Sequence, residues 1–442
     1  MHRPLHFRLT QCFGDSSTTV VTDADILSAV EFSSDGEFLA TGDHGGRIVI
    51  FQKKKGKPVG KNAEYKFLME FQSHEQEFDY LKSLEIEEKI NKIKWLRPTN
   101  NAAFLLSSND KTVKLWKLHE KKSVHFELGE PPPNGGPAFP RAVGCEKAFT
   151  AEPRRVFANA HAYHINSISP CSDGETFLSA DDLRVNIWSL AAVDRCFTVC
   201  DLKPQNMEEL TEVLTAAAFH PTDGSLLLTA SSRGVLRLAD LRARALADGG
   251  GGGGGATRTF AAPEDPAAKS FFSEIVASCS DVRWSADGRQ LFARDFLTVK
   301  VWDVRQERAP VRTVGVHDQL KGRLSELYEN DAIFDKFELG LSPSGQHLAT
   351  GTYGNAFKTF GAADGKEVQA LEVAKNPSSA ARRGAAGDGK APALKGASRR
   401  SSVAARAGEE IDLTKKVLNL SWSPVDDVIA VAGVNKLYIY ST

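Results

Sequence analysis

The residues best suited to chemistry are two histidines, His161 and His164, in the run AHAYHINSI. Two histidines so close together can begin a metal site. A zinc site, however, takes three or four protein ligands, and no further ligand lies nearby in the sequence. The alternative is a structural histidine in a turn. We therefore predict that the chain holds no metal and no cofactor.

Signatures of the common enzyme classes are absent from the chain. It contains no nucleotide-binding glycine loop, no GxSxG elbow, no HExxH helix and no paired CxxC. These motifs supply the phosphate cradle, the nucleophile or the metal ligands on which such chemistry depends. A hydrolase would also need a nucleophile next to a base, and no such arrangement is found. The sequence therefore predicts a protein that is not an enzyme.

A β-meander is the element that the chain repeats. Its first copy, Phe32–Gln52, has turn signals at Asp35-Gly36 and Gly45-Gly46, and apolar residues alternate after each turn. Three of the third strands read TVKLW, RVNIW and TVKVWD, and end at or next to Trp116, Trp188 and Trp302. The other copies are Trp95–Leu118, Ile168–Leu190, Phe219–Arg242, Trp284–Val304, Leu341–Phe360 and Trp422–Ser441.

A lone meander cannot bury its two faces, whereas radial stacking buries both and hides most strand edges. We therefore expect an all-β fold: one seven-bladed WD-repeat β-propeller over residues 1–442, with long insertions between blades. The run Leu5–Phe13 should pair near Leu437–Tyr440 and close the ring. In such a blade, His161 would bond to Asp182 below Trp188.

Composition narrows the class of protein. Lys and Arg number 55 against 56 Asp and Glu, so the chain lacks the basic excess of a bulk nucleic-acid binder. No apolar run approaches the roughly 20 residues that span a membrane, and the first residues lack a signal-peptide core. Cys12, Cys171, Cys196 and Cys279 lie in or beside strand-like runs, which favours buried thiols in a reducing compartment. We expect a soluble, cytoplasmic or also nuclear protein that binds neither nucleic acid nor membrane.

The insertions divide between the two faces of the expected ring, in which each blade has strands A to D. Connections between C and D, and between A and B, share one face. This face is predicted to carry the lysine-rich loop Lys53–Ala63, a projecting arm at 119–155 and a polyglycine spacer at 249–255. Connections from D to the next A share the opposite face. They include Ser73–Asn91, whose Glu, Leu and Lys favour a partly helical segment.

Acidic residues concentrate in the D-to-A connections. The segments 73–91, 204–213, 262–278 and 315–332 contain 16 acidic against 5 basic residues. A neutral chain that gathers its carboxylates at one end of a channel should attract basic segments there. The segment 374–410 leaves from this face; it is basic, poor in large apolar residues and predicted to be disordered. It contains Ser401 and Ser402 after two arginines, so it is either a plain linker or a competitor of basic substrates that phosphorylation releases.

Several runs go beyond a generic propeller. The clearest are FQSHEQEFDYLKSLEIEEKINKIKWL, PRRVFANAHAYHINSIS, SADDLRVNIW, NMEELTEV, SFFSEI and LYENDAIFDKFE. These runs, in this order and over about residues 20 to 440, resemble the WD-repeat 55-kilodalton regulatory (B) subunits of protein phosphatase 2A. The resemblance implies a non-catalytic subunit that binds a scaffold (A) subunit and a catalytic (C) subunit, and recruits basic phosphoprotein substrates through an acidic face.

The resemblance also implies which residues contact substrates. They are Asp23, His44, Tyr163, His164, Asp182, Met207, Glu208, Leu210 and Val213, with an acidic loop at Glu85, Glu87 and Glu88. Two positions depart from the family pattern, which usually has glutamate at Asp23 and lysine at His44. His44 would weaken one salt contact or add pH dependence. The arm is shorter than the family's and rich in proline, which bears on scaffold affinity.

Each of these sites also has a structural interpretation. Asp182 aligns with Asp110 and could cap a turn. Met207 and Leu210 could belong to the core, although their acidic neighbours favour an exposed apolar contact. Glu85, Glu87 and Glu88 could form only the solvated face of a helix. Tyr328 and Phe334 are expected to anchor their loop in the core.

The sequence therefore predicts a substrate-specifying, scaffold-binding subunit of a serine/threonine phosphatase. The alternative is a generic WD interaction platform whose altered arm has lost the scaffold contact. Copurification with the phosphatase subunits distinguishes the two.

Overall fold

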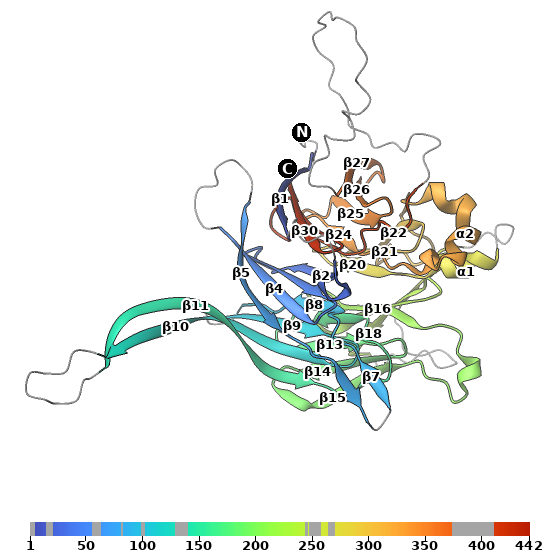
Figure 1. Cartoon of the computed structure of the whole chain (residues 1–442). Coiled ribbons are helices and arrows are strands. Elements are labelled where there is room, and N and C mark those ends of the chain that lie inside the picture. Colours follow the sequence, from blue (N-terminus) through green and yellow to red (C-terminus); the bar gives the residue numbers. More distant parts are fainter. Residues whose placement is uncertain are drawn as a thin grey trace, which may run out of the picture.

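Seven four-stranded antiparallel sheets stand around a central axis in the computed structural model, as Figure 1 shows in part. The predicted seven-bladed, all-β propeller is thus confirmed. The structure describes residues 5–14, 21–54, 63–80, 83–98, 102–128, 140–243, 246, 258–263, 270–373 and 411–442. The predicted polyglycine spacer (249–255) and basic segment (374–410) lie outside the described residues, as does most of the lysine-rich loop.

Each blade runs from an innermost strand A to an outermost strand D. Blades 1 to 4 consist of β2 (Leu27–Phe32), β3 (Phe38–Asp43), β4 (Arg47–Lys53) and β5 (Tyr65–Gln72); β8 (Lys92–Trp95), β9 (Ala103–Ser108), β10 (Val113–Leu128) and β11 (Pro140–Phe157); β12 (Ser167–Pro170), β13 (Thr176–Ala180), β14 (Arg184–Ser189) and β15 (Ala192–Asp201); β16 (Leu214–Phe219), β17 (Leu226–Ser231), β18 (Leu236–Asp240) and β19 (Arg258–Phe260).

Blades 5 to 7 complete the ring. They consist of β20 (Asp281–Trp284), β21 (Gln290–Arg294), β22 (Thr298–Asp303) and β23 (Arg312–Gly315); β24 (Leu339–Leu341), β25 (His347–Thr352), β26 (Ala356–Gly361) and β27 (Glu367–Glu372); β28 (Leu420–Trp422), β29 (Val428–Gly433), β30 (Lys436–Ser441) and β1 (Arg8–Phe13). We call the face with the D-to-A connections and B–C turns the upper face, and the other the lower face.

The first strand of the chain closes the ring in the predicted register. Within β1, Phe13 pairs with Leu437 and Leu9 with Tyr440 of β30, and Figure 1 shows the two chain ends close together. Phe7, just before β1, is 1% exposed and packs edge-on against Trp422, with ring centroids 5.3 Å apart. Its backbone N–H and C=O both bond to the side-chain amide of Gln369 in blade 6. The N-terminal segment therefore joins blade 7 and also contacts blade 6.

The core lies between neighbouring sheets, because alternate residues of each strand face the next blade. Ile48 and Ile50 of β4 are fully buried and pack in one cluster with Ile93 and Trp95 of blade 2. The tight B–C turn of blade 1 needs Gly46, whose φ is +78°. A Cβ there would lie 2.2 Å from the carbonyl oxygen of His74, so a larger residue would displace the neighbouring connection.

A long ribbon leaves blade 2. The strands β10 and β11 pair from Val113 with Phe157 out to Leu128 with Pro140, far beyond the ends of the neighbouring strand β9. In Figure 1 this ribbon extends away from the ring as its most projecting pair of strands. Its C-to-D direction places it on the lower-face side of the blade.

Two local expectations were wrong. The segment Ser73–Asn91 contains no helix among its described residues; it contains a hairpin of β6 (Glu77–Asp79) and β7 (Leu84–Ile86). Its Glu and Leu favour a helix only weakly, and pairing between the two short strands outweighs that preference. Cys196 is exposed on β15, because the outermost strand of a blade has solvent on one side, whereas Cys171 and Cys279 are buried as expected.

A buried histidine makes stability depend on pH. His74 is buried, with Nδ1 3.0 Å from Ser73 Oγ, and burial together with the charge of Lys114 lowers its pKa to about 3. Below the unfolded-state pKa of 6.5, the unfolded chain takes up a proton that the folded chain refuses, so this stability is lost as pH falls toward 3. The slope should be about 1.4 kcal/mol per pH unit.

We expect His74→Asn to reduce the slope of unfolding free energy against pH between 6.5 and 4 by about that amount. Denaturant melts at several pH values measure it. An unchanged slope in the variant would show that other groups dominate acid unfolding.

Candidate functional site

A histidine network below the upper face holds blade 3 together. His161 Nδ1 is 2.9 Å from Asp181 Oδ2, and its Nε2 is 2.6 Å from Ser179 Oγ. Ser179 also accepts the indole N–H of Trp188 at 2.8 Å. The expected partner Asp182 was therefore wrong by one residue: the carboxylate below Trp188 belongs to Asp181. Since both ring nitrogens of His161 are bonded within the protein, the structural interpretation of this histidine holds.

Asp182 does not cap the B–C turn of blade 3 either. The turn N–H groups of Leu183 and Arg184 donate to Asp181 Oδ1 at 2.9 and 2.7 Å. The same task in blade 2 falls to Asn109, which precedes Asp110. Asp182 and Asp110 do occupy equivalent positions, as expected. The residue that caps each turn is the preceding one, Asp181 in blade 3 and Asn109 in blade 2. The carboxylate of Asp182 therefore takes no part in capping this turn.

Asp182 lies at the junction of blades 3 and 4. The side chain is half-buried, and its carbonyl accepts the N–H of Leu214 at 2.7 Å. Burial raises the pKa of Asp182, while the charges of Lys336 and His164 oppose this rise. Lys336 belongs to the connection before blade 6, so charge from the far side of the channel reaches this carboxylate.

Tyr163 and His164 lie on the connection between blades 2 and 3. Both are exposed, and the side chain of His164 keeps 73% of its surface while its Nδ1 lies 3.2 Å from Asp110 Oδ1. The N–H of Ile165 donates to the Asp110 carbonyl, which fixes the path of this connection against the B–C turn of blade 2. The pair therefore presents an aromatic ring and an imidazole to solvent beside Asp182.

The segment Met207–Val213 is the next connection around the upper face, between blades 3 and 4. A short 3₁₀ helix, η2 (Met207–Glu209), begins at Asn206, whose side chain accepts the N–H of Glu208. Met207 is 44% exposed and Leu210 is half-buried, so the interpretation of an exposed apolar contact is the one that the geometry supports. Glu208 and Glu209 are exposed, whereas the remaining acid, Glu212, is paired with Arg237. Val213 is half-buried and donates its N–H to Ser232.

The remaining predicted residues continue around the rim toward blade 1. Asp23 lies in the 3₁₀ helix η1 (Asp23–Asp25), 3.5 Å from Nδ1 of His44 in the B–C turn. Glu85 and Glu87 are exposed and Glu88 is half-buried, on strand β7 and the loop after it rather than on a helix. The Glu87 carbonyl accepts from Asn109 of blade 2. The predicted residues of the connections into blades 2, 3 and 4 thus follow one another around the rim, and Asp23 and His44 contact each other at blade 1.

One exposed feature has no counterpart in the expectations from sequence. Helix α1 (Phe271–Ala277) and the segment formed by η4 (Asp318–Arg323), α2 (Leu324–Glu329) and η5 (Ala332–Phe334) gather four aromatic rings on the upper face. Tyr328 and Phe334 do not anchor their loop in the core: they are 41% and 53% exposed, with centroids 6.0 Å apart. Phe271, 70% exposed, and Phe272 complete the cluster at 5.7 and 5.9 Å from Tyr328.

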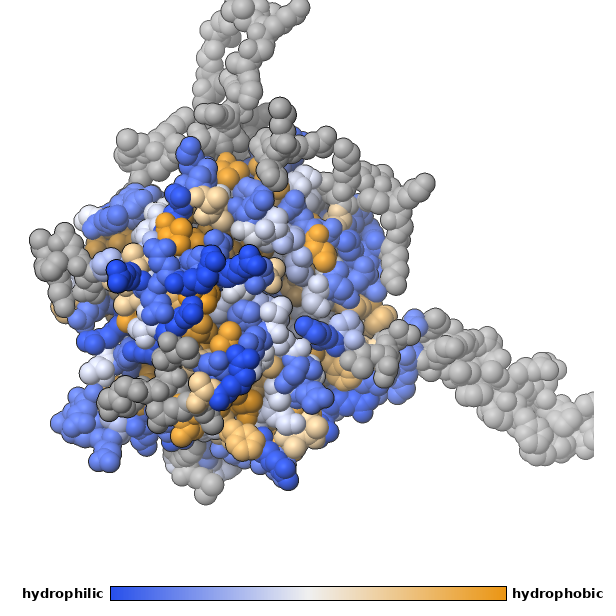
Figure 2. Space-filling view, turned by 180° about the vertical axis from the view of Figure 1, so that it is seen from behind, coloured by the Kyte–Doolittle hydropathy of each residue, from blue (hydrophilic) through white to orange (hydrophobic). Residues whose placement is uncertain are grey.

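The core beneath this cluster explains why it is exposed. Leu327, Ile333 and Phe337 from the same connections fill the buried positions, so the helical spacing directs Tyr328 and Phe334 outward. The adjacent phenylalanines of SFFSEI are the feature of the sequence that could have indicated an exposed aromatic cluster. Figure 2, which shows the side opposite to that of Figure 1, has its apolar surface in small separate patches among hydrophilic residues.

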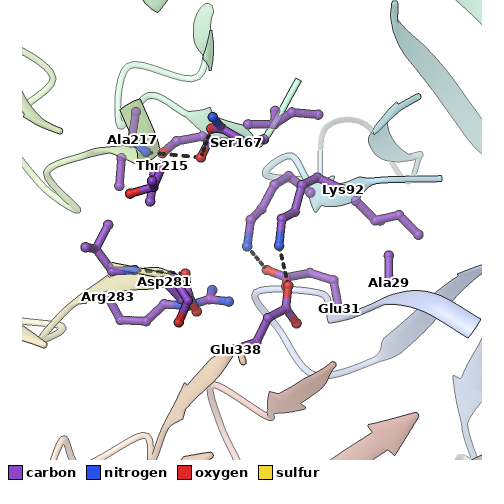
Figure 3. Close-up of a pocket in the computed structure, with 18 of the residues that line it drawn as sticks. Ala29, Glu31, Lys92, Ser167, Thr215, Ala217, Asp281, Arg283 and Glu338 are labelled. Carbon is purple, nitrogen blue, oxygen red and sulfur yellow. Dashed lines mark hydrogen bonds and ion pairs between the residues drawn. The ribbon is translucent and has the colours of Figure 1, made fainter. Parts of the chain in front are cut away.

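The channel of the ring is lined by charge. A cavity of about 220 Å³ lies among the innermost strands, and Figure 3 shows Lys92, Glu31, Arg283, Asp281 and Glu338 extending into it. Lys92 pairs with Glu338 and Lys94 with Glu31, while Arg283 Nε lies 3.0 Å from Asp281 Oδ2. The charges of the channel are therefore matched among themselves.

No group of three or more His, Cys, Asp or Glu side chains in the described part of the chain could hold a metal ion. Within the same residues, no helix is long and apolar enough to cross a membrane.

Adjacent aspartates should separate structure from surface function. We expect Asp181→Ala to cost roughly 3–5 kcal/mol of folding stability, because it leaves His161 buried without its carboxylate. Asp182→Ala should stay within about 1 kcal/mol of the wild type, since its burial already opposes its charge. Chemical denaturation measures both, and equal losses would return Asp182 to a structural role.

Comparison with known proteins agrees with this architecture. The family model described as WD domain, G-beta repeat, matches residues 12–52 and 151–189. The regulatory B subunit of protein phosphatase PP2A from Schizosaccharomyces pombe is 47% identical over 98% of this chain and 97% of its own length. The regulatory subunit sur-6 of serine/threonine-protein phosphatase 2A from Caenorhabditis elegans is 46% identical over 99% and 90%, respectively.

A human relative extends the same match. The B gamma isoform of the 55 kDa regulatory subunit of serine/threonine-protein phosphatase 2A is 47% identical over 95% of this chain and 94% of that protein. All three relatives carry the name of a regulatory rather than a catalytic subunit, and all cover nearly the whole propeller. The chain therefore belongs to the family of WD-repeat 55-kilodalton regulatory (B) subunits of protein phosphatase 2A.

Proposed function

We propose that this chain binds the scaffold (A) and catalytic (C) subunits of the phosphatase and recruits basic phosphoprotein substrates through its upper face. The observation that carries the proposal is the group formed by Asp182, Tyr163, His164, Met207 and Leu210. It places a carboxylate without a turn-capping task beside exposed aromatic and aliphatic side chains.

This group suits a short segment with Arg or Lys beside an apolar anchor. Glu208 and Glu209 are exposed, and neither takes part in an ion pair among the described residues. Exposed ion pairs contribute only about 0–1 kcal/mol each, so the apolar contact must supply much of the affinity. Charge then sets the encounter rate and the sensitivity to salt.

The lower side carries the scaffold contact in this proposal. The ribbon of β10 and β11 is directed away from the upper face, so the scaffold subunit could hold it without covering Asp182. The two strands pair from Val113 and Phe157 out to Leu128 and Pro140, and so present an extended ribbon to a partner. The generic-platform alternative is the case in which this ribbon binds no scaffold subunit.

The apolar anchor can be tested with a basic peptide that has one central leucine. We expect Leu210→Ala to weaken its binding by about 1–2 kcal/mol, the usual range for an interface anchor. Val193→Ala, an exposed apolar residue on the outer strand β15, is the matched control and should leave affinity unchanged. Isothermal titration measures both variants.

A second variant, Glu208→Lys, tests the contribution of charge to peptide binding. It should mainly slow association, and the defect should shrink when added salt reduces the Debye length well below about 8 Å. Wild-type affinity and association rate in both Leu210→Ala and Glu208→Lys would exclude this face as the recruitment site.

The scaffold contact is tested by shortening the ribbon. Lys121 pairs with Ala148, while Ala151 packs against the core of blades 1 and 2. Replacing 121–148 with a short Gly-Ser linker should therefore leave the propeller folded but reduce capture of the purified scaffold subunit at least tenfold. Peptide binding at the upper face is the internal control. Undiminished capture would assign the scaffold contact to other parts of the lower side.

A further inference from the structure

The charged pairs in the channel differ in what they connect. Lys94 and Glu31 lie on the innermost strands β8 and β2 of neighbouring blades. Arg283 and Asp281 lie on one strand, β20. Lys92 and Glu338, in contrast, come from blades 2 and 6, which have two blades between them on one side and three on the other. This pair therefore crosses the channel, as Figure 3 shows.

Glu338 is held firmly on its own side of the channel. Its N–H donates to the Leu418 carbonyl at 2.9 Å, and its carbonyl accepts from Thr350 at 3.0 Å. The next residue, Leu339, donates its N–H to Asp281 Oδ2 at 2.9 Å, which joins blade 6 to blade 5. These hydrogen bonds fix the backbone from which the Glu338 side chain extends into the channel.

The two partners also stand at the inner ends of functional connections. Lys92 begins the strand after the acidic loop of Glu85, Glu87 and Glu88. Glu338 follows Phe334 by four residues and Lys336 by two. The pair thus lies between the acidic side of the upper face and the side that carries the aromatic cluster.

We propose that Lys92 and Glu338 are positioning residues, whose ion pair sets the spacing between these two sides of the upper face and, through Lys336, the surroundings of Asp182 in the group that binds the basic peptide. This inference rests on the proposed function. Neither residue touches the peptide. Their effect on binding passes through the connections that follow or precede them.

We call the Lys92–Glu338 ion pair the strut. The charge of Lys92 agrees with this role. Burial opposes the charge of Lys92, but the carboxylates of Glu338 and Asp281 outweigh it and raise the pKa of its ammonium group. Burial lowers the pKa of Lys94 more than Glu31 raises it. Lys92 is thus the more strongly held cation of the two, which fits the pair that spans the channel.

Binding of the leucine-containing basic peptide tests the strut. We expect Glu338→Gln to weaken binding at least fivefold, with capture of the scaffold subunit unchanged on the lower side. Glu31→Gln breaks the pair between neighbouring blades and should stay within twofold of wild type. The exchange Lys92→Glu with Glu338→Lys should restore most of the affinity, because the attraction across the channel returns.

A second variant guards against simple misfolding. Lys92→Met with Glu338→Met removes both charges at once, which buried pairs often tolerate without loss of stability. It should fold and still bind the peptide weakly. Wild-type affinity in this variant or in Glu338→Gln would overturn the inference. Equal losses in Glu338→Gln and Glu31→Gln would also overturn it, since general stability would then explain both.

Hydrogen exchange separates this inference from the proposed function. In Glu338→Gln, amides of residues 84–91 and 332–337 should exchange faster than in Glu31→Gln, whether or not the peptide binds. If the wild type fails to bind the peptide, the recruitment proposal falls while faster exchange still supports the strut. Unchanged exchange in both segments would overturn the strut itself.

Discussion

Closure of the ring is the constraint on which the rest of the structure depends. The N-terminal strand β1 adds to β30, and Phe7 packs against Trp422, so the first and last parts of the chain form one blade. Radial closure buries both faces of every blade and leaves only short strand edges, along the channel and around the outside of the ring. The order of the upper-face connections around the channel is thereby fixed.

Within each blade, buried hydrogen bonds decide which side chains remain for binding. Asp181 uses its carboxylate for His161 and for the turn, and the neighbouring Asp182 is released from both tasks. One position along the turn separates a structural residue from a candidate contact. In blade 2, Asn109 caps the turn in the same way, while Asp110 accepts from Asn91 at 2.8 Å and contacts His164. The hydrogen bonds of the turn in blade 3 therefore decide that Asp182, and not Asp181, is available to a partner.

Charge is distributed in two ways. In the channel, three cations face three carboxylates and satisfy one another in a confined space. On the upper face, several acids stay exposed, and Lys336, whose charge opposes the raised pKa of Asp182, lies across the opening. A chain of nearly neutral net charge thus has ion pairs that hold the channel together and, on the upper face, an acidic surface that attracts basic segments.

The sequence by itself determined the repeat, the seven blades, the closing register and the acidic bias of the D-to-A connections, because alternation and turn residues are local signals. It misplaced details that depend on which side chains are buried and on which groups pair with one another. Tyr328 and Phe334 lie outward because Leu327, Ile333 and Phe337 compete for the same core. The hairpin of β6 and β7 replaced an expected helix, and the partner of His161 was shifted by one residue. Only the folded structure decided these points, since burial and the choice of pairing partner depend on the packed surroundings and not on the local pattern of residues.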